Sequence, residues 1–360
     1  MFMRTPESRF YHDYDVFIGL DVDKKSYSFT TIEHGRSHYG KVVSNAASFL
    51  RFVRKNYVDK KVVLAYEAGP TGYDFYDVAT VNGYPCLVTP PATLYKRSNE
   101  RVKNNRLDSA KIAEQLESGQ LCGNRVPEGS YREIRHLVGM RENYVERRRQ
   151  AKQRIKSLLL FEHLGQASDD GEETDKGWSL TYFEKLKSLP CNPSVRLRLD
   201  SLIKDHEYAR QELLGVYRAL KDFCVKNTEI SQYMNYLRSI PGIGFVTAAT
   251  ILGRVGNPAL LKHERELGCF TGLTPRERST GEIVNHGHIS GFGDNILRSL
   301  LVEAAWIAIR HDRELRMFYD RIRSKHHPKI AARIAITAVA RKLTMRIHCV
   351  LKNKRPYLIH

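Results

Sequence analysis

Apolar and polar residues alternate with two different periods over the first third of the chain. Four runs rich in β-branched and aromatic residues predict strands: Val16–Asp21, Ser26–Ile32, Val62–Tyr66 and Cys86–Val88. Three segments with apolar residues at helical spacing predict helices: Ala46–Lys55, Asp74–Asn82 and Ser109–Glu117. This order of elements predicts an α/β domain over residues 15–125, and the spacing alone does not choose among the α/β folds.

The middle of the chain, residues 130–228, carries two long helical patterns separated by an acidic insertion. Arg132–Phe161 predicts one long basic helix, and Gly165–Ser179 lacks periodicity, which predicts an exposed loop. From Pro193 to about Asn227, apolar residues recur alternately three and four apart, the spacing of a coiled-coil seam. The seam consists of Leu199, Leu202, His206, Ala209, Leu213, Val216, Leu220 and Phe223. It packs either on the basic helix or on a second copy of the chain, and His206 is interpreted as an interior residue.

Residues 235–356 predict an all-α region with one polar loop. In Ser239–Thr247, Gly242 and Gly244 precede an apolar helix, which predicts a helix-hairpin-helix element whose turn offers backbone N–H groups to a phosphate. A plain corner between two helices is the alternative. Ile251–Leu273 predicts helix with short breaks, and Thr274–Asn295 predicts a Gly-rich loop. Two further apolar helices are predicted, over Ile296–Ile309 and Ile330–Leu351.

The charge balance favours a polyanionic partner. The chain has 360 residues, of which 42% are hydrophobic, enough for a packed core, and its formal net charge is +18. A charge of this size favours nucleic acid, and a merely solubilising surface is the alternative. Five residues of the basic helix are candidate phosphate contacts: Arg147, Arg148, Arg149, Lys152 and Arg154. The alternative for that helix is a solvated face whose charges pair with Glu142 and Glu146.

The six cysteines lie far apart and form no C-x-x-C pair, so the sequence predicts reduced, mostly buried thiols rather than a zinc site or a disulfide framework. The segment Met1–Tyr14 is polar and charged, unlike a signal peptide, and no apolar run reaches the length of a membrane span. These features predict a cytoplasmic, nucleoid-associated protein with no membrane partner.

Carboxylates stand at three positions where strands end or a helix begins. Asp21 and Glu67 each end an apolar strand, and two neighbouring strands of one sheet would bring them close together. Asp108 immediately precedes the helix predicted from Ser109, which can deliver a third carboxylate to the same sheet edge. Oxygen ligands suit a hard cation, so these residues predict a Mg²⁺ or Mn²⁺ site.

Four motifs occur in the order found in one known family: Glu67–Tyr73, Arg101–Ser109, Pro241–Gly244 and Gly272–Pro275. With them the chain resembles, from Asp15 to Pro356, the DEDD transposases of bacterial insertion sequences, the group of the Piv invertase and insertion sequence family 110. The resemblance implies a RuvC-like, RNase H-like N-terminal domain whose metal ligands fall here on Asp21, Glu67, Asn105 and Asp108. The family has aspartate where this chain has Asn105, which keeps an oxygen ligand and loses one negative charge.

The resemblance also implies a hydroxyl nucleophile in the C-terminal region, just before a glycine. In the segment Arg276–Gly281 two hydroxyls compete for that role. Direct register with the family favours Thr280, whereas Ser279 is a primary alcohol and is less hindered than a β-branched threonine. Glycines in this loop allow the backbone to approach a phosphate closely.

These observations favour a DNA recombinase of a mobile element, in which the acidic domain and the loop hydroxyl together cut and rejoin DNA. The expected partners are DNA and further copies of the chain in a dimer or tetramer. Members of the resembling family use an element-encoded structured RNA to pair with DNA, and the charge of this chain fits such an RNA or DNA alone. One alternative is a structure-specific nuclease that needs only Asp21, Glu67 and Asp108 with two metal ions. The other is a nucleic-acid-binding protein without catalysis, disabled at Asn105.

Overall fold

The computed structural model describes residues 13–90, 104–121, 123–164, 178–277 and 286–358. Over these residues the protein is a mixed α/β structure, as the sequence predicts. The chain divides into two compact units, Met1–Pro127 with Lys262–Arg298 and Glu128–Leu261 with Ser299–His360. Residues 262–298 therefore group with the N-terminal unit, whereas the three regions expected from the sequence follow the order of the chain.

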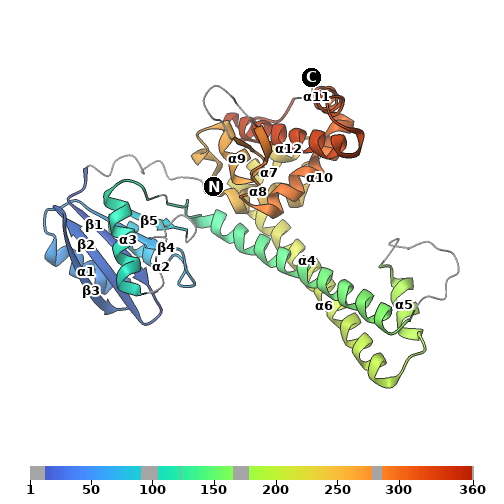
Figure 1. The fold of residues 1–360 in the computed structure, drawn as a ribbon, viewed down its shortest axis with the longest axis horizontal. Helices are drawn as coiled ribbons and strands as arrows, with labels where there is room; N and C mark the ends of the chain where they lie inside the picture. The colour runs from blue at the N-terminus through green and yellow to red at the C-terminus, as the bar shows by residue number, and fades with distance from the viewer. Residues whose placement is uncertain (1–12, 91–103, 122, 165–177, 278–285, 359–360) are drawn as a thin grey trace. The chain divides into compact units, whose positions relative to one another are not determined.

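One five-stranded sheet organises the first unit (Figure 1). Its strands are β1 (Val16–Val22), β2 (Ser26–Glu33), β3 (Arg36–Val43), β4 (Val62–Glu67) and β5 (Cys86–Thr89), in the order β3-β2-β1-β4-β5. β2 is antiparallel to both β1 and β3, whereas β1, β4 and β5 run parallel. The sequence pattern does not predict β3, because this edge strand is polar and largely exposed and so lacks a run of apolar residues.

Helices cover both faces of this sheet, and side chains alternate between the faces along each strand. One face packs on α1 (Ala46–Asn56) and α2 (Asp74–Val81), with Phe49 and Phe75 among the buried rings. The other face packs on α3 (Asn105–Glu117). The contacts on that second face join Phe17, Val63 and Ala65 of the strands to Ile112, Ala113 and Leu116 of the helix.

Two long helices of the second unit, α4 (Gly129–Phe161) and α6 (Pro193–Lys226), lie side by side (Figure 1). They run antiparallel, since Tyr144 contacts Tyr208 near the middle of the pair while Ile155 clusters with Leu199 further along α4. The predicted seam is confirmed for five of its eight residues, which are buried: Leu199, His206, Ala209, Val216 and Leu220. The other three, Leu202, Leu213 and Phe223, are only partly buried, and the neighbouring Ile203 and Cys224 are buried instead. The seam packs on α4 of the same chain. Of the two partners that the sequence left open, the basic helix and a second copy of the chain, the structure therefore shows the basic helix.

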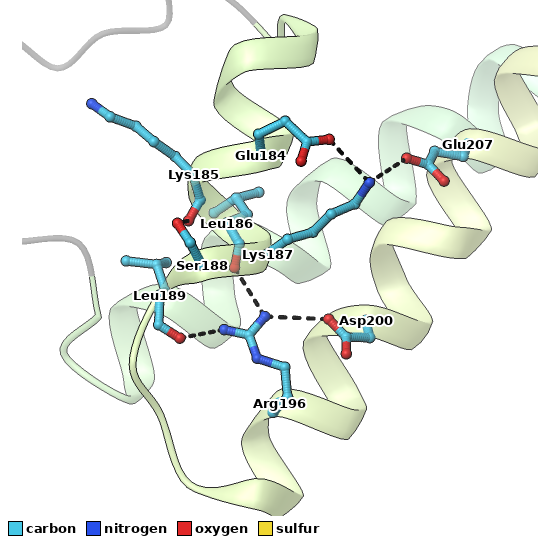
Figure 2. Close-up of polar contacts among 9 residues, drawn as sticks. All are labelled: Glu184, Lys185, Leu186, Lys187, Ser188, Leu189, Arg196, Asp200 and Glu207. Carbon is cyan, nitrogen blue, oxygen red and sulfur yellow. Dashed lines mark hydrogen bonds and ion pairs between the residues drawn. The ribbon is translucent and has the colours of Figure 1, made fainter.

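A short helix, α5 (Leu180–Ser188), packs against the N-terminal part of α6 (Figure 2). The Arg196 guanidinium donates from Nη1 to the Leu186 carbonyl at 3.0 Å and to Asp200 Oδ1 at 3.2 Å, so one side chain joins α5 to α6. Lys187 lies 3.3 Å from Glu184 and 3.5 Å from Glu207. Phe183 and Leu186 are buried with residues of α4 and α6. An apolar cluster with polar contacts beside it therefore holds α5 on the helix pair.

The remaining helices of the second unit include α7 (Thr228–Arg238), α8 (Phe245–Val255), α10 (Asn295–His311), α11 (Arg313–Arg323) and α12 (Pro328–Asn353). A buried polar network joins several of them. Asp312 is 2% exposed and caps α11 by accepting from the Leu315 N–H at 2.9 Å. Its other oxygen accepts from Arg346 of α12 at 2.9 Å and from the Tyr357 hydroxyl at 2.6 Å. The buried carboxylate is therefore both paired and hydrogen-bonded, as burial of a charge requires.

The segment predicted as helix over Ile251–Leu273 is broken more than expected. It contains the end of α8, a 3-10 turn at Pro258–Leu260 and the short helix α9 (Glu264–Phe270). The Gly-rich loop that follows contains two strands that the sequence did not predict, β6 (Pro275–Glu277) and β7 (His286–Ile289), paired antiparallel.

Of the five cysteines in the described ranges, none is disulfide-bonded and two are buried, Cys86 and Cys224. The expectation of free thiols is confirmed for these five, and the expectation that most are buried is wrong. No helix within the described ranges is both long enough and apolar enough to cross a bilayer.

Candidate active site and nucleic-acid interface

Asp21 and Glu67 stand at equivalent positions on neighbouring parallel strands. In the register of β1 and β4, Leu20 lies opposite Tyr66, and each acidic residue is the next one along its strand. Because side chains alternate, both carboxylates are on the face that packs on α3. Adjacent strands are about 4.8 Å apart, so the two side chains leave the backbone at neighbouring points. Both are partly buried.

The first turns of α3 lie against that same face. Gly19 of β1 permits the close approach, since a Cβ there would lie 2.4 Å from both the Ser109 carbonyl oxygen and the Ala113 nitrogen. A buried hydrogen bond of 2.9 Å joins the hydroxyls of Ser109 and Thr30. The helix begins at Asn105 rather than at the predicted Ser109, because the Asn104 side chain caps it by accepting from the Arg106 N–H.

Asn105 and Asp108 occupy the first turn of α3. Residues four apart lie on the same side of a helix. Asn105 is four residues before Ser109, and Asp108 is four residues before Ile112. Because Ser109 and Ile112 are buried, Asn105 and Asp108 lie on the side of α3 that faces the sheet. Asn105 is exposed, and Asp108 is partly buried with Lys111 at 3.4 Å. Within the described ranges, no three His, Cys, Asp or Glu side chains are grouped closely enough to hold a metal ion. The structure thus brings Asp21 and Glu67 to neighbouring positions and places Asn105 and Asp108 on the covering helix, without closing a four-ligand cluster.

Sequence reasoning missed buried hydroxyl residues on the same face. Ser28 lies opposite Asp21 in the register of β1 and β2, and Thr89 lies opposite Glu67 in the register of β4 and β5. Both are buried, and the Tyr39 hydroxyl is 3.5 Å from the Ser28 hydroxyl. The available signal was a hydroxyl residue at an interior strand position. It is a weak signal, because threonine is common in strands for steric reasons alone.

Ser279 and Thr280 fall outside the described residues, in the segment that joins β6 to β7. The base of this hairpin is described. Arg276 donates to the Ser290 carbonyl from Nε at 3.3 Å and from Nη2 at 3.0 Å. Gly293 has a φ of +147°, and a Cβ there would lie 2.4 Å from the Phe270 carbonyl oxygen. A glycine is therefore required where the chain leaves the hairpin.

The predicted basic residues of α4 have different environments. Arg149 donates to Glu146 from Nε at 2.8 Å and from Nη2 at 2.7 Å, and this hydrogen bonding lowers the pKa of Glu146 to about 2. Lys152 lies 5.1 Å from the centre of the Trp178 ring. Arg154 is exposed and forms no ion pair with another described residue. The five cations are therefore not equally available to a phosphate.

Arg148 is held by a buried histidine. Its Nε donates to His206 Nε2 at 3.1 Å, and His206 is 1% exposed. Burial, with the neighbouring Arg148, Lys152 and Arg210 cations, lowers the pKa of His206 to about 4, so the ring is neutral near pH 7 and can accept. The interpretation of His206 as an interior residue is confirmed, and the ring also orients one guanidinium of the basic helix.

The turn between α7 and α8 contains both predicted glycines. Gly242 has a φ of +88°, and a Cβ there would lie 2.2 Å from the Ala304 carbonyl oxygen of α10. Gly244 is exposed and precedes α8 without a side-chain cap. The turn and α10 line a hollow of about 440 Å³. Gly242 is thus required by packing on α10, whereas Gly244 leaves the first N–H groups of α8 uncovered by a side chain.

Two family models match this chain. One describes a DEDD transposase of the insertion sequence 110 type and matches residues 18–163, and the other, described as Transposase IS116/IS110/IS902 family, matches residues 234–320. The first match includes the sheet, α3 and α4, and the second includes the turn with Gly242 and the hairpin of β6 and β7.

Known proteins are similar along most of the chain. The protein y4qE of Sinorhizobium fredii is 29% identical over 300 residues, which is 81% of this chain and 71% of that protein. The transposase for insertion sequence element IS1111A of Coxiella burnetii is 25% identical over 82% of this chain and 78% of its own length. The pilin gene-inverting protein of Moraxella bovis is 28% identical over 36% of this chain and 40% of its own length.

The chain belongs to the IS110 family of transposases, because the two family models match it in chain order and similar transposases cover most of its length. It is therefore a transposase of an insertion sequence, an enzyme that cuts and rejoins DNA. The resemblance inferred from four short motifs is confirmed.

Proposed function

We propose that this transposase recombines DNA by combining a metal-dependent acidic site with a covalent hydroxyl nucleophile. The observation that carries the proposal is the placement of Asp21 and Glu67 at neighbouring positions on one sheet face, with α3 packed on that face through Gly19 and Ser109. The strand order β3-β2-β1-β4-β5, antiparallel and then parallel, supports a RuvC-like, RNase H-like fold for residues 15–125.

The residues at this face fit a hard divalent cation. Asp21, Glu67 and Asp108 offer carboxylate oxygens and Asn105 offers an amide oxygen, the donor set that Mg²⁺ or Mn²⁺ prefers. A cation bound there would stabilise the charge that develops on a phosphate under attack. The Lys111 Nζ lies 3.4 Å from Asp108 Oδ1 and balances the charge of that carboxylate when no metal ion is bound. Asn105 keeps an oxygen donor while reducing the negative charge of the group by one.

Ser279 or Thr280 supplies the nucleophile in this proposal. Attack of the hydroxyl oxygen on a DNA phosphorus forms a phosphodiester to the protein and releases the hydroxyl of the cut strand, so the bond energy is kept for rejoining. The segment that carries both hydroxyls is flanked by two paired strands whose base is joined through Arg276 to Ser290.

In this proposal, residues 130–228 and 235–356 bind nucleic acid. Arg147, Arg148, Lys152 and Arg154 of α4 contact phosphates, and Gly244 opens the N-terminus of α8 to another phosphate. The partners are DNA, an element-encoded structured RNA that selects sequences by pairing, and further copies of the chain in a dimer or tetramer. The net charge of +18 supports binding to more than one polyanionic strand.

The proposal is tested by trapping the covalent intermediate. A nicked DNA substrate whose short strand diffuses away after cleavage should leave a protein–DNA adduct with the wild-type enzyme in Mg²⁺, and peptide mapping should place the DNA on Ser279 or Thr280. The matching single alanine variant should lose the adduct. Asp21→Ala and Glu67→Ala should lose it while still binding DNA, whereas Asn105→Asp should retain or increase it.

Cleavage that persists in the Ser279→Ala, Thr280→Ala double variant, with ends free of protein, contradicts the covalent step and favours metal-activated water. Full adduct formation by Asp21→Ala and Glu67→Ala contradicts the role of the acidic face.

A further inference from the structure

A hollow of about 310 Å³ opens between α4 and α6. It is lined by Arg147, Gln150, Ala151 and Arg154 of α4 and by Asp205, Tyr208 and Ala209 of α6. Two of the lining residues, Ala151 and Ala209, are buried and have small side chains. Pockets for small ligands range from about 300 to 1,000 Å³, so this hollow has room for one small group such as a nucleobase.

An exposed aromatic ring stands at the wall of the hollow. Tyr208 is 53% exposed, and its ring packs against Tyr144 at 6.4 Å between centroids and 72° between planes. Arg147 lies 5.8 Å from the centre of the Tyr144 ring, so the two tyrosines stand beside a cation. An aromatic side chain next to cations is the arrangement on which proteins stack the bases of single-stranded nucleic acid.

Charges of both signs flank the hollow. Arg147 and Arg154 are exposed and form no ion pair with another residue in the described part of the chain. They are two turns apart on α4, about 10.5 Å along the helix axis. Asp205 of α6 lines the hollow, and its side chain forms no ion pair or hydrogen bond with another described residue. The hollow therefore offers two cations for phosphates and one acceptor for an amino group.

We infer that this hollow binds one unpaired nucleotide, with its base stacked on Tyr208 and its flanking phosphates on Arg147 and Arg154. The exocyclic amino group of adenine, cytosine or guanine donates to Asp205, whereas thymine and uracil carry no such donor. An acidic peptide would occupy the two arginines but leave Asp205 facing like charge. The inference rests on the proposed role of α4 in binding nucleic acid, and it adds a subsite that takes a base rather than only phosphates.

Fluorescence anisotropy with the full chain tests this subsite. The probes are a labelled duplex, the same duplex with one bulged cytosine and the same duplex with one bulged thymine, each also made in RNA with uracil for thymine. The wild-type protein should bind the cytosine bulge about 5- to 150-fold more tightly than the paired duplex, the range for stacking of one base. Tighter binding of the DNA or of the RNA bulge identifies which strand supplies the nucleotide.

Three variants separate the parts of the subsite. Tyr208→Ala should remove the preference for a bulge, and Tyr208→Phe should keep it because the ring remains. Asp205→Asn should reduce the difference between cytosine and thymine bulges while leaving binding of the paired duplex unchanged. Arg218→Gln is the matched control on α6, because Arg218 does not line the hollow, and it should keep both preferences.

Equal affinity of the wild-type protein for paired and bulged probes overturns the inference, as does an equal loss for both probes in Tyr208→Ala. Displacement of the probes by an acidic peptide, with no base preference, also overturns it and assigns the hollow to a protein partner. Failure of the proposed role of α4 in binding nucleic acid would give a different result. In that case, replacing arginines of α4 would not change the salt dependence of the affinity for the paired duplex.

Discussion

Gly19 is the single residue on which the acidic face depends most directly. It lies on β1 two positions before Asp21, and the backbone of α3 fills the place that a Cβ would need. Contact with backbone atoms leaves no flexible side chain to move aside. The missing side chain therefore sets the distance at which α3, with Asn105 and Asp108, meets the sheet.

We predict that Gly19→Ala destabilises the protein by about 1–3 kcal/mol, the usual cost of overpacking, and reduces DNA cleavage. The control is Gly215→Ala in α6, where nothing lies within 4 Å of the added Cβ. In a helix this control should stabilise by about 0.4–1 kcal/mol. Urea unfolding followed by circular dichroism measures both effects. A neutral Gly19→Ala with full activity would contradict the close packing of α3 on β1.

At the scale of elements, α4 combines a buried seam with a basic surface. Arg149 is already paired with Glu146 on the same helix, whereas Arg147 and Arg154 face the hollow without an ion pair to another described residue. Glu142, which the sequence offered as a partner for the basic face, pairs instead with Arg254 of α8. The arginines of α4 that are not paired with a carboxylate are therefore distributed unevenly along the helix.

We predict that replacing Arg147, Arg148 and Arg149 together by glutamine weakens binding to duplex DNA. It should also flatten the log–log salt slope by up to about 2 to 3 units, at roughly 0.9 for each lost phosphate contact. Singly, Arg147→Gln should change the slope more than Arg149→Gln, because Glu146 already neutralises Arg149. Salt titrations of anisotropy measure the slopes. An unchanged slope in the triple variant would indicate that these arginines of α4 do not contact phosphates.

At the scale of the whole molecule, stability rests on contacts between segments far apart in the sequence. Asp312 accepts from Arg346 and from Tyr357, and the Tyr357 N–H donates to the Ser239 hydroxyl at 2.7 Å. These bonds tie α11, α12 and the end of the described chain to the turn after α7. Without this carboxylate, Arg346 would keep Glu314 as its ion-pair partner, whereas the Leu315 N–H and the Tyr357 hydroxyl would lose their acceptor.

We predict that Asp312→Ala destabilises the protein by about 1–3 kcal/mol, the usual cost of leaving buried hydrogen-bonding groups without their partner. Asp320→Ala is the matched control, because Asp320 forms a solvent-exposed pair with Arg316 in the same helix at 2.9 Å. Exposed pairs contribute about 0–1 kcal/mol, so this variant should unfold at nearly the wild-type urea concentration. Equal effects of the two variants would contradict the assigned role of the Asp312 network.

The sequence by itself determined the family and most elements, because these depend on local periodicity and on motifs in chain order. The strands β1, β2, β4 and β5, the long helices α4 and α6, and the seam around Leu199 and Leu220 all follow from spacing of apolar residues. The edge strand β3 and the paired strands β6 and β7 could not be predicted, since pairing of polar residues leaves no periodic pattern.

The tertiary structure decided which side chains meet. Asp21 and Glu67 become neighbours only through the parallel register of β1 with β4, and the start of α3 at Asn105 depends on the Asn104 cap. The pairing of Arg148 with His206 and the hollow at Tyr208 arise only when α6 packs antiparallel on α4. Strand register and interhelical packing determine these contacts. Each depends on two segments that are far apart in the sequence, so the residue pattern of one segment alone does not predict it.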